Sequence, residues 1–525
     1  MSVNKLFQAS NEVSIDSDKV KIPASNGNTF VERNRIVFTI DPQHQFLSMR
    51  ECLLEFDIKL NNNEESCYLP RAGAQRLIKS CRIQTKDGKV LENITNYNVM
   101  ASYMYDYSLT SGEKDARSLT ELAEGDQINA GEFRDNLVIG NQFLQPYKDG
   151  TNPSVAKKDV TQRVVLKLWS KIFDNYENEV VYPNVFTGGT QIIVELEDAT
   201  KCLEVIPQLN SDVREHCATI DAALNTSGNP HAAIAVKNEN AKGINGGEND
   251  MKGCPFNVSQ RVRIQLADGT SPDNTSTIAS IQVDGSGRYE LTLTSGFTAG
   301  VNYPAGSNIG SVITDITTNY TISNPSVICC RVNVPDSWRN SLIDLVSENK
   351  FRYNMKSINN VEVSQQSGAT NFTNYINSNA TSVSAVLSIA NDSQTASNYT
   401  TDLLRGKYEK FNDYNYNYNN TTHPTLPVPV TKLNTENVSQ EHISELVKAN
   451  DSFWGTKSLK MYHNCFAMGR QFAPYNGAMR LTGKDLSHRI ATISGQSLST
   501  NMVFNNYLVR NIQMIVSKDG VEIIE

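Results

Sequence analysis

Gly188 and Gly189, in the run VVYPNVFTGGTQIIVELEDA, could cradle a phosphate or turn a strand back on itself. A phosphate loop must open into a helix, because the free N–H groups at the helix N-terminus bind the anion. The residues after the glycines instead alternate apolar and polar side chains with the period of a half-buried strand. The residues before them are also extended, and paired glycines accept positive φ angles, so the pattern favours a β-hairpin over a nucleotide site.

Two other groups of residues could bind a metal ion. His463 and Cys465 are two positions apart and could share one face of a strand, but no second pair of zinc ligands lies nearby in the sequence. The run NGGEND at 245–250 could offer oxygen ligands to calcium, although such runs are more often solvated turns. We therefore predict no metal site and no cofactor.

The sequence also lacks the motifs of common enzymes. It contains no Gly-x-Ser-x-Gly elbow, no His-Glu-x-x-His, no phosphate-binding P-loop and no EF-hand loop. Aspartates and glutamates are spread along the chain, and nothing singles out a pair for glycosidase chemistry. We predict no catalytic residues and no enzymatic activity, with a glycoside hydrolase on a β scaffold as a rival hypothesis.

Composition narrows the class of protein further. A chain of 525 residues, 39% hydrophobic and 20% charged, should fold into two or three domains. The net charge of −8 comes without clusters of Lys and Arg, which argues against a direct nucleic-acid site. No apolar run reaches the roughly 18 residues of a membrane span, and the first residues lack an apolar signal core, so we expect no secretion through a signal peptide.

Most of the chain carries the alternation expected of β-strands. Apolar and polar residues alternate at 35–40, 52–60 and 164–168. The Asp-Gly pair at 87–88 lies between two extended runs, which is the strongest short hairpin signal. Residues 97–104 instead place Tyr, Met and Ala at helical spacing, so we predict one short helix packed beside a sheet.

The second half repeats this organisation after an interruption. Between about 209 and 318, turn-rich segments separate short β-like pieces, which indicates an inserted β module. Asp336 is predicted to cap a helix that connects two β regions, and Ser439 to cap another. The run 411–430 is interpreted as a loop, and its part at 412–420, where Tyr414, Tyr416 and Tyr418 alternate with Asn, as either a wet contact surface or a disordered loop tip. Many strands and few short helices predict an all-β protein of sandwiches or barrels.

Several longer runs carry a family resemblance. They are GAQRLIKSCRIQTKDGKVLENITNYN, VVLKLWSKIFDNYENEVVYPNVFTGGTQIIVELEDA, SVICCRVNVPDSWRNSLIDL, NYINSNATSVSAVLSI and MYHNCFAMGRQFAPYNGAMRL. In this order they resemble the double jelly-roll major capsid proteins of polinton-like viruses, virophages and large eukaryotic DNA viruses, in the lineage of adenovirus hexon. The resemblance covers about 30–199 and 327–345 and is weaker beyond. The insertion has no counterpart.

The resemblance implies a fold and a domain plan. The fold is all-β, with two adjacent eight-stranded antiparallel jelly rolls, short helices and a β-rich loop insertion. The implied domains are an N-terminal arm at 1–27, a first roll at 28–335 containing the module at about 209–318, and a second roll at 336–525. The arm would run beneath a shell, the module would form an outer tower, and Trp338 with its helix would be the joint between rolls.

The implied function is that of a viral major capsid protein. Three copies would form a trimer of nearly hexagonal outline, and such trimers would tile an icosahedral shell around double-stranded DNA. Expected partners are the chain itself, neighbouring trimers, minor capsid or penton proteins, and an internal membrane reached through the arm, with no small-molecule substrate. The expected location is the virion, assembled inside the host cell. The alternative is a β-sandwich carbohydrate- or receptor-binding protein.

Overall fold

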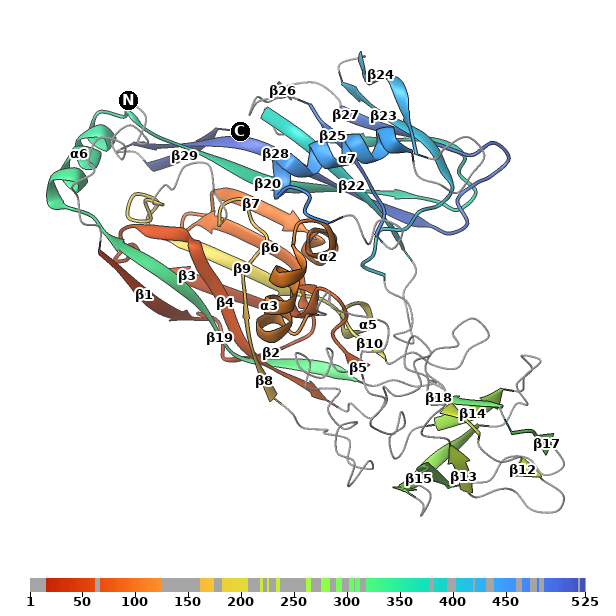
Figure 1. Ribbon diagram of the computed structural model, residues 1–525. Helices are drawn as coiled ribbons and strands as arrows, with labels where there is room; N and C mark the ends of the chain where they lie inside the picture. The colour runs from red at the N-terminus through yellow and green to blue at the C-terminus, as the bar shows by residue number, and fades with distance from the viewer. Residues whose placement is uncertain are drawn as a thin grey trace.

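The computed structural model has two folded halves and a smaller module. It describes residues 16–61, 67–123, 161–173, 182–205, 218–220, 224–225, 233–236, 261–265, 275–283, 289–294, 302–305, 307–311, 318–377, 382–393, 403–418, 421–430, 439–458, 465–472, 479–480, 486–517 and 520–524. The N-terminal half, drawn mainly in red and orange, lies beside the C-terminal half, drawn mainly in blue (Figure 1). Each half is a β-sandwich.

One sheet of the first half has five antiparallel strands. They are β1 (Asp16–Pro23), β2 (Thr29–Val31), β4 (Leu47–Asn61), β8 (Thr161–Leu166) and β19 (Asn319–Asn333). Their order is β1-β19-β4-β8, and β2 also pairs with β19. In β4 the alternation buries Leu54, Phe56 and Ile58, each exposed by 2% or less. The strand predicted at 52–60 is therefore confirmed.

A ten-stranded sheet runs through both halves. The first half contributes β3 (Arg35–Ile40), β9 (Thr190–Leu196), β6 (Ile78–Thr85) and β7 (Val90–Thr95). The second contributes β20 (Phe351–Gln365), β28 (Met502–Ser517), β22 (Ser382–Asp392), β25 (Ala467–Gln471), β26 (Met479–Arg480) and β29 (Gly520–Ile524). The halves meet where β7 pairs in parallel with β20, at Asn93 and Asn359. The two sandwiches are thus joined edge to edge.

Short helices lie on and between the sheets. They are η1 (Gly73–Leu77), α2 (Tyr97–Tyr107), α3 (Ser111–Glu121), α5 (Ala199–Cys202), α6 (Asp336–Ser347) and α7 (Gln440–Phe453). All residues of α2 are buried, and the helix predicted at 97–104 is confirmed. Ser439 caps α7 as predicted, because its hydroxyl accepts a hydrogen bond from the Glu441 N–H at 3.3 Å.

The helix α6 connects the two sandwiches, as predicted, and lies at one end of the molecule (Figure 1). The N-cap position belongs to Pro335, and Asp336 is the first helical residue, so the predicted Asp336 cap is wrong. The Asp336 carboxylate instead pairs with Arg339 at 2.9 Å within the first turn. On its inner face Leu342 is buried, and the Trp338 ring packs on Phe46 with 5.7 Å between ring centroids.

A four-stranded sheet completes the second half. Its order is β21 (Asn371–Ile376), β27 (Leu486–Thr492), β23 (Phe411–Tyr418) and β24 (Thr421–Pro429). The loop predicted at 411–430 is therefore wrong. Tyr414 and Tyr416 are fully buried, and the Tyr414 hydroxyl donates to the Gly469 carbonyl of β25 at 3.1 Å. These two tyrosines belong to the core, and neither a contact surface nor a loop tip describes them.

The two predicted hairpins have different outcomes. β6 and β7 form the Asp-Gly hairpin as predicted, with Gly88 at φ 83°. The hairpin predicted at Gly188 and Gly189 is wrong, because β9 pairs with β3 and β6 instead. Before the glycines, Tyr182 makes only an isolated bridge to Leu47. Gly189 is still required, since a Cβ there would lie 2.8 Å from the Ile40 carbonyl oxygen.

A small β module stands apart from both sandwiches (Figure 1). Its six-stranded sheet has the order β11 (Ala218–Thr219), β18 (Asn308–Ser311), β14 (Arg261–Gln265), β15 (Thr275–Val283), β16 (Tyr289–Leu293) and β13 (Ala233–Val236). A further pair in the module is β12 (Leu224–Asn225) with β17 (Asn302–Tyr303), while β5 (Cys67–Tyr68) and β10 (Glu204–Val205) form a separate pair outside it. The insertion is β-rich, as predicted.

Candidate functional site at the seam between the two rolls

Buried polar contacts hold the two halves together. We call the contact of β7 and α2 in the first half with β20, β28 and α7 in the second half the seam. Its side-chain hydrogen bonds to backbone carbonyls include Ser357 Oγ to Leu91 (2.7 Å), Asn360 Nδ2 to Thr95 (3.0 Å) and Tyr507 OH to Asn96 (2.7 Å). Each of these donors is buried, so each needs an acceptor within the protein, and the resulting hydrogen bonds fix the two sheets in one position.

Glu92 is the central carboxyl of the seam. It is fully buried, and its Oε1 accepts hydrogen bonds from the Ile358 N–H (2.8 Å) and the Lys171 N–H (3.1 Å). Its Oε2 accepts a hydrogen bond from the Ser170 hydroxyl. Burial raises the pKa of Glu92 to about 7, against the opposing effects of these donors and of the Arg510 charge. The group therefore titrates much closer to neutral pH than an ordinary glutamate.

The helix α2 extends the seam toward α7. The Tyr107 hydroxyl donates to the Cys465 carbonyl at 2.7 Å, and the Ser108 hydroxyl donates to the Gly455 carbonyl at 2.7 Å. The Tyr103 hydroxyl meets the Asn450 side chain of α7 at 3.1 Å. Since both tyrosines are fully buried, these hydrogen bonds are made out of contact with water.

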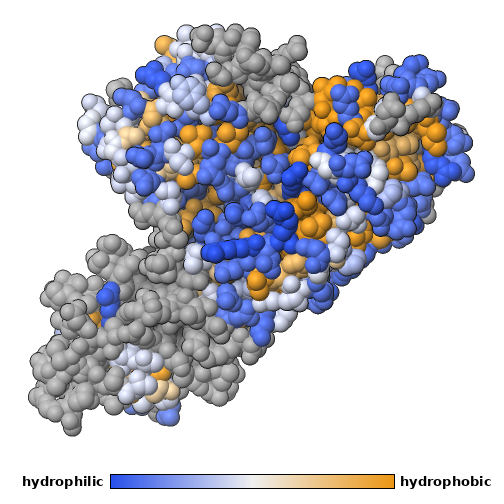
Figure 2. Space-filling model, turned by 180° about the vertical axis from the view of Figure 1, so that it is seen from behind, coloured by the Kyte–Doolittle hydropathy of each residue, from blue (hydrophilic) through white to orange (hydrophobic). Residues whose placement is uncertain are grey.

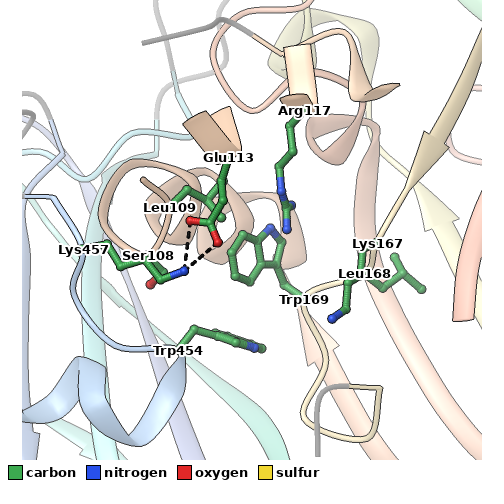
Figure 3. Close-up of a pocket in the computed structure, with 9 residues that line it drawn as sticks. All are labelled: Ser108, Leu109, Glu113, Arg117, Lys167, Leu168, Trp169, Trp454 and Lys457. Carbon is green, nitrogen blue, oxygen red and sulfur yellow. Dashed lines mark hydrogen bonds and ion pairs between the residues drawn. The ribbon is translucent and has the colours of Figure 1, made fainter. Parts of the chain in front are cut away.

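A cavity of about 320 Å³ opens at the edge of the seam. It lies between α3, the chain after β8 and the chain after α7 (Figure 3), and it is lined by Ser108, Leu109, Glu113, Arg117, Lys167, Leu168, Trp169, Trp454 and Lys457. The Trp169 and Trp454 rings meet edge to face, with centroids 5.0 Å apart. Residues of both halves therefore build the cavity.

Cationic side chains surround these two tryptophans. The Arg117 guanidinium lies over the Trp169 ring at 4.7 Å from its centroid, a favourable cation–π distance. Lys457 Nζ pairs with both Glu113 oxygens, at 2.7 and 2.9 Å (Figure 3). The lining thus carries the charges of Arg117, Lys167 and Lys457 against the single carboxylate of Glu113.

The structure does not bring together the residues that the sequence offered as metal ligands or as a phosphate loop. His463 and the run 245–250 lie outside the described residues. The side chain of Cys465 is buried, and its backbone carbonyl accepts the hydrogen bond from Tyr107 in the seam. Within the described ranges, no group of three or more His, Cys, Asp or Glu could hold a metal ion. After Gly188 and Gly189 comes β9, where a phosphate loop would need a helix.

Sequence reasoning missed Glu92, Trp169 and Trp454. Glu92 was visible as an acidic residue inside the apolar strand VLENIT, a position that normally requires buried partners. Trp169 ends the strand run VVLKLW, but nothing in the sequence indicates that Trp454 lies against it.

Comparisons with known proteins define the fold. No protein-family model and no curated protein matches the chain. Among solved structures it is similar to the Faustovirus major capsid protein, at 9% identity over 97% of this chain and 92% of that one, with a TM-score of 0.50. It also matches the Sputnik virophage structure (10% identity, 98% and 91% covered, TM-score 0.46) and the PBCV-1 virus capsid (8%, 99% and 99%, 0.46).

The similarity to the Faustovirus protein covers nearly the whole chain, and together with the two sandwiches described above it shows a double jelly-roll fold. This confirms the predicted all-β fold of two adjacent antiparallel jelly rolls with short helices and a β-rich insertion. It also confirms, at the level of the fold, the resemblance to double jelly-roll major capsid proteins. The two halves are called the first and second roll from here on.

Proposed function

We propose that this protein is a viral major capsid protein, whose trimers of nearly hexagonal outline tile an icosahedral shell around double-stranded DNA. The observation that carries the proposal is the sheet that continues from one roll into the other, with the seam locked by buried polar groups. Because two rolls are held rigidly side by side, each chain supplies two of the six similar units of a hexagonal outline. Three chains related by threefold symmetry then complete that outline. In this role the chain needs no catalytic group.

The surface suits contacts with other copies. Figure 2 shows mostly polar side chains over one face, with apolar side chains gathered at its upper right. The exposed apolar residues of the described chain include Leu426 on the edge strand β24 and Tyr375 on the edge strand β21. Large exposed apolar groups on sheet edges favour association, and trimer contacts would bury on the order of 2,000 Å² or more.

The parts of the chain take separate roles in this proposal. Residues 1–27 would face the shell interior, where minor capsid or penton proteins and an internal membrane are the expected partners. Within that range, 16–23 form β1 and pair along their length with β19, so this part is built into the first roll. The module at about 209–318 would project outward as a tower. No helix in the described ranges is long and apolar enough to cross a membrane.

Native mass measurement tests the proposal against its rivals. A capsid protein should give a particle of three times the chain mass, stable on dilution, whereas a monomer that binds a glycan column would favour the carbohydrate-binding alternative. The carbohydrate-binding alternative is weakened, because Tyr414 and Tyr416, which the sequence placed on a possible contact surface, are buried. Release of reducing sugar, abolished by one carboxylate substitution, would instead favour a glycoside hydrolase.

A further inference from the structure

We propose that the cavity at the seam binds a small organic anion, which joins a carboxylate or phosphate to an apolar ring. The first support is a buried donor without an acceptor. Trp169 is 5% exposed, and its Nε1 has no hydrogen-bond partner among the described residues. Its nitrogen lies beside the Arg117 guanidinium (Figure 3), which also donates a long hydrogen bond of 3.4 Å to Glu121, so two donors stand close together at the cavity. An anionic oxygen would satisfy the Trp169 N–H and could accept a further hydrogen bond from Arg117.

The balance of charge points to the same ligand. Although the whole chain has a net charge of −8, the cavity lining carries three cationic side chains and one carboxylate. That carboxylate, of Glu113, already accepts hydrogen bonds from Lys457 and from the Thr110 N–H at 2.7 Å. Arg117 also pairs with the buried Glu121 at 3.4 Å, so three cationic side chains face two carboxylates and an excess of positive charge remains, which would attract an anion from solution.

The size and walls of the cavity require more than a bare ion. About 320 Å³ is much larger than one phosphate and lies at the lower end of ligand-binding cavities in general. Trp169, Trp454, Leu109 and Leu168 supply apolar wall area. The two indole rings offer stacking surface to a planar apolar group. The anionic group would sit between Trp169 Nε1 and Arg117, with its ring against Trp454.

Titration with phenylacetate tests this proposal in the full-length protein. The sequence holds three tryptophans, so the Trp338→Phe variant leaves only Trp169 and Trp454 as fluorescent reporters, both in the cavity. We expect a saturable change in emission and a matching calorimetric isotherm. Phenylacetamide, the neutral isostere, and inorganic phosphate, the bare anion, should each bind at least ~10-fold more weakly, because the first lacks the charge and the second lacks the ring.

Two substitutions locate the site. Trp169→Phe keeps an aromatic ring and removes the N–H donor, and Arg117→Gln removes the guanidinium; each should weaken phenylacetate binding at least ~10-fold. Arg339→Gln on α6 is the matched control and should leave binding unchanged. If Arg117→Gln does not fold, because Arg117 also pairs with the buried Glu121, Trp169→Phe and Lys457→Met decide. Absence of saturable binding, equal affinity for phenylacetamide or phosphate, or unchanged affinity in Trp169→Phe would overturn the proposal.

Discussion

The buried carboxyl of Glu92 should make the stability of the protein depend on pH, and Glu92→Gln should remove that dependence. The pKa of Glu92 is about 7 in the folded protein, against an ordinary value of 4.5, because burial disfavours its charge. The folded state therefore keeps a proton that the unfolded chain releases above about pH 4.5. It follows that the stabilisation is complete below pH 4.5 and is lost as the pH rises through 7.

The size of the effect follows from the same two values. A pKa raised from 4.5 to about 7 corresponds to roughly 3 kcal/mol of unfolding free energy, lost between pH 4.5 and pH 8. Two buried histidines act in the opposite direction, since burial lowers the pKa values of His442 and His488 to about 3. The two histidines contribute equally to the unfolding free energies of wild type and Glu92→Gln, so their contribution cancels in the difference.

Urea unfolding of wild type and Glu92→Gln at half-unit intervals from pH 4.5 to 9 measures this difference. We expect the stability of wild type relative to the variant to fall by about 3 kcal/mol up to pH 8 and then to level off. Glu348→Gln, at an exposed carboxyl whose pKa is lowered by its hydrogen bond with Lys350, should show no such trend above pH 5. A difference that stays constant with pH, or rises, would refute the reasoning about Glu92.

Three further substitutions, with Gly112→Ala as a control, test the packing of the second roll and the seam. His488→Phe should stabilise the protein by about 1–2 kcal/mol, because both ring nitrogens of His488 are buried without hydrogen-bond partners among the described residues. In calorimetry the variant should also lose less stability than wild type as the pH falls below 6.5, because burial lowers the pKa of His488. Tyr107→Phe removes the 2.7 Å hydrogen bond to the Cys465 carbonyl and should cost about 1–2 kcal/mol in urea unfolding. Gly469→Ala should cost about 1–3 kcal/mol, since the added Cβ would lie 2.7 Å from Ala449 Cβ and push α7 away from β25. In the control Gly112→Ala the added Cβ would meet no atom within 4 Å, so thermal melts should show a neutral or slightly stabilising effect. An unchanged melting temperature in Gly469→Ala, or a lower one in His488→Phe, would contradict the packing described.

Local patterns predicted the elements whose causes are local. The alternation in β3, β4 and β8 follows from one buried and one exposed face, and the β6–β7 turn follows from the positive φ of Gly88. The α2 helix was visible because its apolar and aromatic residues recur at helical spacing. Ser439 could be recognised as a cap because a cap depends on neighbouring backbone groups alone.

Elements that depend on distant partners were not predictable in this way. The run at 411–430 has the composition of a loop, yet β23 is buried because α7 and β25 cover Tyr414. Pro424 and Pro427 are tolerated in β24 because that strand is at the edge of its sheet. β9 finds its partners in β3 and β6 rather than across the adjacent glycines. Glu92 and the Trp169–Trp454 pair acquire their roles only when the two rolls meet.

Single-particle imaging of the purified protein tests the central claim most directly, namely that one chain supplies two rolls fixed side by side for a threefold capsomer. We expect class averages with threefold symmetry and a nearly hexagonal outline, in which each chain accounts for two adjacent rolls. Monomeric particles, or an oligomer in which the two rolls of a chain take variable positions, would contradict it.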